Sequence, residues 1–375
     1  MKMKQKIVKF IFIGIWLFVY DFQMSGEEHI RGCWMYGSSL NSENISSIVN
    51  KLADNYINNV YLLVKGTGGT KTNPTILTNF ITQAHSKAIK VHLWYCVFQD
   101  KVYVTSHPDA HVYHCPNPKI SVKPYQMDTT WWVNPLYPGY KEYVLRNIGY
   151  FVNNFNCDGI HLDYIRYSHM VYSFDPFSLK KAASLGCDTT RLLNFFNTEK
   201  DYVYSAKEKG FVNLYLQQDK DVVAWVTMRK NVISNYISAI RDIIEKVKPT
   251  LELTAAFMPE SAEDPNYGDV YYAQNYALHS TWLDMIAPMS YFKSYNKNTN
   301  WLKSITSNAI TRVVPTCKIA AGLQAFDGVS TTEMKEQINY AFEGGAHGVI
   351  IFQYENITDS CWNIINSHFK SMLGK

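Results

Sequence analysis

The chain has 375 residues, of which 47% are hydrophobic and 18% charged, and its formal net charge is +4. This length suits one large α/β domain or two average ones. No long basic run follows the N-terminus, so the composition predicts no nucleic-acid partner. Aromatic residues reach 15%. They are compatible with stacking against sugar rings, although most such side chains lie in protein cores.

The N-terminus carries a basic segment, MKMKQKIVK, followed by the apolar residues 10–20. This apolar stretch is short for a membrane span and fits a secretory signal. No clear small-residue cleavage motif precedes Glu27, so an uncleaved membrane anchor is the alternative. We therefore expect residues 1–26 to form a signal peptide or signal anchor, residues 27–375 to form the working domain, and the protein to be secreted or extracellular.

Seven cysteines leave at least one thiol without a partner inside the chain. Cys33 and Cys96 lie in strand-like runs and are expected in the core. In an oxidising compartment, polar surroundings would allow Cys115 to pair with Cys187, and Cys317 with Cys361. No C-x-x-C spacing occurs, so neither a zinc ribbon nor a redox motif is indicated.

Eight short apolar runs alternate with helix-like segments after the signal. The runs are at 30–37, 59–66, 90–98, 159–167, 251–260, 283–292, 318–326 and 348–357, and the helix-like segments include 44–57, 75–88, 138–154, 229–247 and 331–343. This alternation predicts an α/β protein with a (β/α)₈ TIM barrel fold. An open doubly wound sheet is the rival fold, but no G-x-G-x-x-G or Walker sequence follows an early strand.

Two connections are too long to be simple loops. Residues 99–137 precede the helix before the fourth strand, and residues 168–224 follow that strand. Loops of this length are usually functional or contain small elements of their own. We expect the second to lie on the C-terminal rim of the barrel, where active sites of this fold are built.

The fourth run, GIHLDYIRY, holds three ionisable residues within six positions. His161 and Asp163 are two residues apart and share a strand face, with Asp163 closer to the open end of the barrel. Arg166 lies at or beyond the strand end, where it could keep the carboxylate ionised through a charge-assisted bond. A catalytic carboxylate and a structural Asp–Arg pair both fit this spacing.

The segment 132–167 resembles the core of the glycoside-hydrolase-like family 10 proteins, in which an Asn-Pro and a helix precede Asp-Gly-Ile-His-x-Asp with Tyr and Arg behind. Four flanking segments resemble the family as well: RGCWMY, the helix start with Trp225, Arg229 and Asn231, LTAAFMPE, and LDMIAPMSYF. The similarity spans about residues 30–357. It implies a (β/α)₈ barrel that hydrolyses a glycosidic bond in a polysaccharide or cell-wall glycan. We expect no cofactor or metal.

Glycoside hydrolysis normally uses two carboxyl groups, one ionised and one protonated. Asp163 matches the family's strand-four carboxylate and is expected as the ionised nucleophile or base. Glu260, which follows the apolar AAFMP, is the first candidate for the acid. The family pattern varies there, so a surface glutamate at a loop start is the competing interpretation. Glu355, at the end of the eighth strand, is the second candidate for the acid.

Other side chains near the strand ends are candidates for substrate binding. Tyr291 matches the family's strand-six tyrosine, and Gln324 ends the seventh strand. Trp94, Tyr95 and Trp34 offer stacking faces or core rings, and His161 could orient a hydroxyl or be structural. Asp158 and Asp284 precede their strands and are expected at the opposite, stabilising end of the barrel.

Competing enzyme classes lack their signatures. A metal-dependent barrel hydrolase would need H-x-H on an early strand, and a serine hydrolase would need G-x-S-x-G. A non-enzymatic alternative remains, namely a secreted barrel that binds glycans without cutting them. The separation of Asp163 from the second carboxyl group would distinguish the two.

Overall fold

The computed structural model describes residues 28–113, 131–170, 172–197 and 206–375. The expected signal segment and Cys115 lie outside these residues. No described helix is both long and apolar enough to cross a lipid bilayer.

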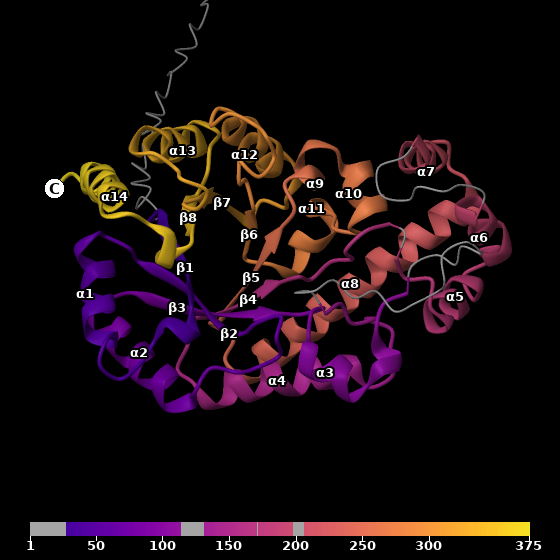
Figure 1. The fold of residues 1–375 in the computed structure, drawn as a ribbon, viewed down its shortest axis with the longest axis horizontal. Helices are drawn as coiled ribbons and strands as arrows, with labels where there is room; N and C mark the ends of the chain where they lie inside the picture. Colours follow the sequence, from indigo (N-terminus) through magenta and orange to yellow (C-terminus); the bar gives the residue numbers. More distant parts are fainter. Residues whose placement is uncertain (1–27, 114–130, 171, 198–205) are drawn as a thin grey trace, which may run out of the picture.

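Eight parallel strands close into a barrel in chain order, which confirms the predicted fold (Figure 1). All eight apolar runs form strands. They are β1 Ile30–Tyr36, β2 Asn59–Lys65, β3 Lys90–Cys96, β4 Gly159–Asp163, β5 Glu252–Phe257, β6 Met285–Pro288, β7 Lys318–Gln324 and β8 Gly348–Phe352.

Helices on the outside of the barrel bury the outward face of the strands (Figure 1). The longer ones are α1 Ile45–Asp54, α2 Pro74–Ser86, α4 Tyr140–Asn154, α8 Lys220–Val247, α12 Trp301–Arg312, α13 Thr331–Glu343 and α14 Asp359–Met372. Three short helices stand between β5 and β6 in place of one long helix: α9 Glu260–Glu263, α10 Pro265–Tyr271 and α11 Tyr276–His279. The predicted helical segments are therefore confirmed, and α12 and α14 are additional.

Alternation along each strand separates two apolar regions. Inward side chains such as Trp34, Tyr61, Trp94 and Ile350 fill the barrel interior. Outward side chains, with those of the helices, form the larger core. Tyr95 belongs to this outer core and packs against Phe151 of α4, so the suggestion that it stacks on sugars is wrong.

The connection after β4 builds a second small core. Helices α5 Pro176–Ala183, α6 Thr189–Asn197 and α7 Ala206–Leu216 gather beside the N-terminal half of α8 (Figure 1). Trp225 and Val226 of α8 are buried there, whereas its C-terminal half packs on the barrel. The helix thus begins nine residues before the predicted position 229, because the inserted helices cover its first turns.

The connection before α4 is tied to the barrel by a buried ion pair. Lys65 at the end of β2 lies 3.1 Å from Asp100, and its ammonium donates to the carbonyls of Cys96 and Gln99. Asp100 also caps α3, Lys101–Ser106. A buried charge is tolerated only when it is paired and hydrogen-bonded in this way. The pair fixes the C-terminal end of β3, which borders β4 at Asp163.

Candidate active site

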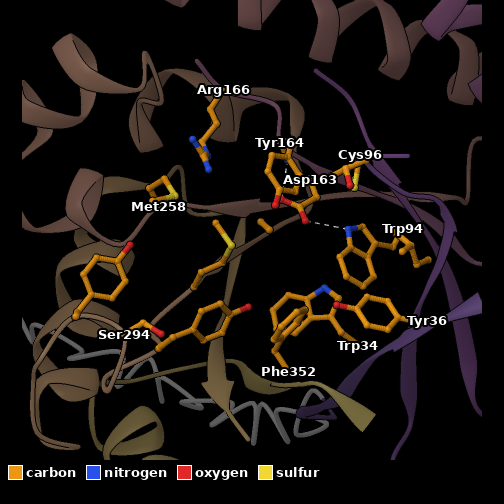
Figure 2. Close-up of a pocket in the computed structure, with 16 residues that line it drawn as sticks. Trp34, Tyr36, Trp94, Cys96, Asp163, Tyr164, Arg166, Met258, Ser294 and Phe352 are labelled. Carbon is orange, nitrogen blue, oxygen red and sulfur yellow. Dashed lines mark hydrogen bonds between the residues drawn. The ribbon is translucent and has the colours of Figure 1, made fainter. Parts of the chain in front are cut away.

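A pocket of about 550 Å³ opens at the C-terminal ends of the strands (Figure 2). Its position is the one where barrel enzymes place their active sites. The lining residues come from all but one of the strands or the loops that follow them: Trp34, Tyr36, Leu63, Thr67, Trp94, Cys96, Asp163, Tyr164, Arg166, Ala256, Met258, Met289, Tyr291, Ser294, Tyr295 and Phe352.

Asp163 is the one residue with a carboxyl group among the sixteen that line the pocket. It ends β4, and only 8% of its surface is exposed. Oδ1 accepts a 2.6 Å bond from the backbone N–H of Tyr164, and Oδ2 accepts a 3.0 Å bond from the indole N–H of Trp94 (Figure 2). Burial raises the pKa of Asp163, while these two donors and the charge of Arg166 oppose the rise. The net effect favours the protonated acid more than in a free aspartate.

The backbone turns sharply after this carboxyl group. Tyr164 has a positive φ of 51°, which is uncommon for a residue other than glycine. The turn directs the N–H of Tyr164 back to the side chain of Asp163. Strained residues of this kind tend to cluster at functional sites.

Arg166 lies beyond the end of β4, as its position in the sequence predicted, but it does not make the expected bond to Asp163. The hydrogen bonds on Asp163 in the described structure come from Trp94 and Tyr164. The guanidinium lies 5.0–5.5 Å from the ring centres of Trp132, Tyr164 and Tyr272. It therefore acts on Asp163 through its charge alone.

Glu260 begins α9, just after β5, and is half-buried. It is not among the residues that line the pocket. Its two oxygens each accept a 3.0 Å bond from a phenol, Oε1 from Tyr272 and Oε2 from Tyr295. Burial raises the pKa of Glu260 against the effect of these donors. Tyr295 does line the pocket, so it is the link between Glu260 and the cavity.

His161 lies on the same face of β4, below the pocket, and is fully buried. Its Nε2 atom is 3.1 Å from the indole nitrogen of Trp34, and its Nδ1 atom is 2.8 Å from the hydroxyl of Thr254. Burial holds the pKa of His161 well below the usual range, so the ring is neutral. Since the indole can only donate, Nε2 must accept and Nδ1 carries the proton. His161 thus supports Trp34, and the structure does not bring it to the substrate position that was expected.

Gln324 and Glu355 are also outside the lining. Gln324 is fully buried. Its side-chain oxygen accepts a hydrogen bond from the backbone N–H of Lys293, and its own backbone N–H donates to the side-chain oxygen of Gln337. Glu355 is exposed and accepts bonds from the backbone of Tyr36 and from Ser39, which ties the loop after β1 to the chain after β8. The structure gives both residues loop-supporting contacts outside the pocket lining, in place of the substrate contacts expected of Gln324 and the acid or substrate-binding role expected of Glu355.

Seven of the sixteen residues that line the pocket are aromatic (Figure 2). Trp94 and Tyr36 stack with ring centres 5.9 Å apart. Phe352 packs edge-on against Trp34 and Trp94, and beside Tyr291. Trp34 and Trp94 were expected from the sequence as stacking faces or core rings, and Tyr291 as a phenol that bonds sugar hydroxyls. An aromatic wall with one polar acid is the surface on which sugar rings stack.

Several lining residues were not singled out from the sequence. Tyr36 and Phe352 end β1 and β8, so their place at the strand ends was a usable signal. Cys96 ends β3 and lines the pocket, although it was expected to be a plain core residue. Tyr295 stands in a loop after β6, and no periodicity marks it.

Other sequence expectations are settled by their contacts. Asp158 and Asp284 do lie at the start of β4 and β6, where they bind backbone N–H groups of neighbouring strands. Cys317 and Cys361 are buried free thiols, so the suggested pairing is wrong. Cys187 is buried near Asp221. The described residues contain no group of His, Cys, Asp or Glu that could hold a metal ion.

Residues 68–341 match the family model described as glycosyl hydrolase-like 10. No match was found among curated protein sequences.

The fold is similar to that of solved glycoside hydrolases. The glycoside hydrolase domain of PgaB (BpsB) from Bordetella bronchiseptica has a TM-score of 0.67 at 11% identity, covering 92% of this chain and 98% of that one. The catalytic domain of β-amylase from Paenibacillus polymyxa has a TM-score of 0.64 at 9% identity, covering 92% and 99%. The β-galactosidase from Marinomonas ef1 has a TM-score of 0.63 at 10% identity, covering 92% and 60%.

At these identities the likeness to solved structures shows the fold alone. The family match covers most of the chain and includes β3 to β7. It also agrees with the resemblance seen in segment 132–167. This chain belongs to the glycosyl hydrolase-like 10 family.

Proposed function

We propose that this protein is a glycosidase that hydrolyses O-glycosidic bonds in a polysaccharide or cell-wall glycan. The observation that carries the proposal is the carboxyl group of Asp163 in an aromatic pocket at the catalytic end of the barrel. Membership of the family and the glycoside hydrolases among the fold neighbours support it.

In this proposal Asp163 is the general acid. A glycosidic oxygen must receive a proton as its bond to the sugar breaks, and a carboxyl group with a raised pKa supplies one. Burial gives Asp163 this property, and its place in the lining gives it access to substrate. This reverses the roles expected from the sequence, in which Asp163 was the ionised partner and Glu260 the acid.

The aromatic walls would hold the sugar by stacking. Trp94 and Trp34 line the pocket with only 4% and 2% of their surface exposed, and their indole N–H groups are occupied by Asp163 and His161. Their faces are therefore fixed in orientation before a ligand arrives, which reduces the entropy lost on binding.

A glycan-binding protein without activity is the second candidate. The observation that favours it is the position of Glu260, which does not line the pocket and lies behind the lining residue Tyr295. A barrel with one accessible carboxyl group would bind sugars without the second group that hydrolysis normally needs.

The test is the release of reducing ends from a panel of cell-wall and storage glycans by residues 27–375, beside Asp163→Asn and Asp54→Asn. Asp54 is exposed and ends α1, away from the pocket. Release by the wild type and by Asp54→Asn, lost in Asp163→Asn while glycan binding persists, is the expected result. Equal activity of Asp163→Asn would contradict the assignment of the acid. Binding without release by any form would establish the second candidate.

The proposal also places the protein outside the cell or on its surface, through residues 1–26. The basic start followed by an apolar run supports this. Mass spectrometry of the protein from the medium and from membranes tests it, since cleavage near Glu27 indicates secretion and an intact N-terminus in membranes indicates an anchor.

A further inference from the structure

Glu260 is held between two tyrosines that differ in one respect. Tyr272 and Tyr295 each donate a 3.0 Å hydrogen bond to one of its oxygens. Tyr272 is buried and is not part of the pocket lining, whereas Tyr295 is half-buried and lines the pocket. Only one of the two phenols therefore stands between the carboxyl group and the cavity.

The hydroxyl of Tyr295 can take part in two hydrogen bonds at once. It donates its proton to Glu260, and its oxygen keeps lone pairs that can accept from a group in the pocket. Such a phenol can receive a proton on one side while it gives its own proton to the carboxylate on the other.

The ring of Tyr295 is fixed in place. It packs against Trp301 with ring centres 5.1 Å apart, and the indole of Trp301 donates a 2.6 Å bond to Glu263. Both glutamates are in the same turn, α9. The distance between the phenol and Glu260 is thereby set by one small packed unit, which is what a precise proton path requires.

Several charged groups surround this unit. Arg312 donates to the carbonyls of Ala262 and Glu263 in α9, and the ammonium of Lys297 lies 5.9 Å from the ring centre of Trp301. Arg166 lies beside Tyr272 and its charge acts on Glu260, Tyr272 and Tyr295 alike. The hydroxyl of Tyr276 donates to the carbonyl of Met258, and the charge of Glu260 helps burial to raise the pKa of Tyr276. Both phenols that hold Glu260 have a pKa raised by burial and by its charge. Tyr295 therefore keeps its phenolic proton at rest and is not a stable phenolate nucleophile.

We propose that Tyr295 is a catalytic residue that passes a proton from a water molecule in the pocket to Glu260, so that Glu260 acts as the general base without touching the substrate. This inference rests on the proposed function. Glu260 does not line the pocket, and the bond to Tyr295 connects it to a reaction there.

The step balances as a single displacement. The oxygen of the water bonds to the anomeric carbon as one of its protons moves to the oxygen of Tyr295, and the phenolic proton of Tyr295 moves to Oε2 of Glu260. The glycosidic C–O bond breaks, and its oxygen takes the proton of Asp163. Asp163 ends as a carboxylate and Glu260 as an acid, and exchange with solvent restores both. Direct attack by water inverts the configuration at the anomeric carbon.

The two tyrosines provide a matched pair of variants. Tyr295→Phe and Tyr272→Phe each remove one phenol from the same carboxylate, but only the first breaks the path to the pocket. We expect Tyr295→Phe and Glu260→Gln to lower kcat about 100-fold or more, within the range for general base catalysis, with KM nearly unchanged. Tyr272→Phe should lower kcat less than about 10-fold. The double variant Tyr295→Phe/Glu260→Gln should be no slower than either of its two single variants, because each of these changes breaks the same proton path.

Wild-type protein provides a second measurement that does not depend on any variant. In mixtures of H₂O and D₂O, and where bond cleavage limits turnover, kcat should vary non-linearly with deuterium content, because several protons move together. Equal losses in Tyr295→Phe and Tyr272→Phe, or additive losses in the double variant, would overturn the relay while leaving the glycosidase intact. Absence of cleavage by the wild type would instead overturn the proposed function, and the relay with it.

Discussion

Two pairs of carboxyl groups stand at opposite ends of this barrel, and their partners differ. At the N-terminal ends of the strands, Asp158 bonds to His85 and to the backbone of Val91. At the C-terminal ends, Asp163 and Glu260 accept bonds from an indole, a backbone N–H and two phenols.

Asp284 repeats the pattern of Asp158. It pairs with Arg241 at 2.7 Å and accepts a bond from the backbone of Leu253. Asp158 and Asp284, at the N-terminal ends of the strands, thus bond to basic side chains and to strand backbone. The hydrogen-bond donors that the structure gives Asp163 and Glu260, at the C-terminal ends, are all neutral. Burial raises the pKa of Asp163 and of Glu260, and their neutral donors oppose this rise without cancelling it. A buried carboxyl group with a raised pKa keeps its capacity to exchange protons near neutral pH. The comparison separates residues that hold the barrel from residues that can react in it.

The largest expected difference between the two ends is in catalysis. Asp163→Asn should reduce kcat about 10³-fold or more, because it removes the proposed proton donor. Asp158→Asn should leave kcat within about three-fold, because Asp158 does not reach the pocket, while its lost partners should lower the melting temperature. Steady-state kinetics and thermal melts of both variants check this. A comparable loss of kcat in Asp158→Asn would erase the distinction.

The second comparison concerns stability. Asp284→Asn should destabilise the fold by about 1 kcal/mol or more, because it weakens the bonds to Arg241 and Leu253. Glu260→Gln should leave the melting temperature at pH 7 equal or higher.

The sign for Glu260 follows from its raised pKa. Its ionised form is disfavoured in the folded state, so its contribution to stability falls as the pH rises from the unfolded pKa through the folded one. Glutamine removes that cost, and any gain over wild type should vanish below about pH 4, where the unfolded carboxyl group is also protonated. A lower melting temperature for Glu260→Gln than for Asp284→Asn would contradict the assignment of roles.

A smaller effect is expected at the donor to Asp163. Trp94→Phe removes the indole N–H that lowers the pKa of Asp163, so this pKa should rise further. Since the proposed acid works when protonated, activity falls as the pH rises through its pKa, and the alkaline limb of the pH–rate profile should move to higher pH. Trp34→Phe is the control, because it loses an indole bond to His161 and not to Asp163. An alkaline limb that stays in place in Trp94→Phe, or moves equally in Trp34→Phe, would contradict the acid role.

The sequence was sufficient to predict the barrel because its signal is repeated. Each buried parallel strand is an apolar run, and each outer helix has its own apolar face, so eight repeats reinforce one interpretation. Asp163 was singled out because it matches the strand-four carboxylate of the family that the segment resembles, whereas the spacing alone fitted a structural Asp–Arg pair equally well. The start of α8 was misjudged because its first turns pack on the inserted helices and not on the barrel.

The rest of the site depended on partners that spacing does not reveal. Gln324 was expected in the pocket because it ends β7, but loop residues that follow β6 consume its hydrogen bonds. His161 shares its strand face with Asp163, yet it lies two residues earlier in β4, where its ring bonds to Trp34 and Thr254 and does not line the pocket. Tyr295 lies in an irregular loop, and only the folded chain brings it to Glu260.

The central claim is that the pocket above β4 cleaves glycosidic bonds by using Asp163 as acid and Glu260 through Tyr295 as base. The most direct test is to follow glycan hydrolysis by ¹H NMR and to identify the first anomer formed at the new reducing end. We predict cleavage with inverted configuration in the wild type and none with Asp163→Asn. Retained configuration would contradict the proton relay, and bound glycan that is never cleaved would contradict the claim as a whole.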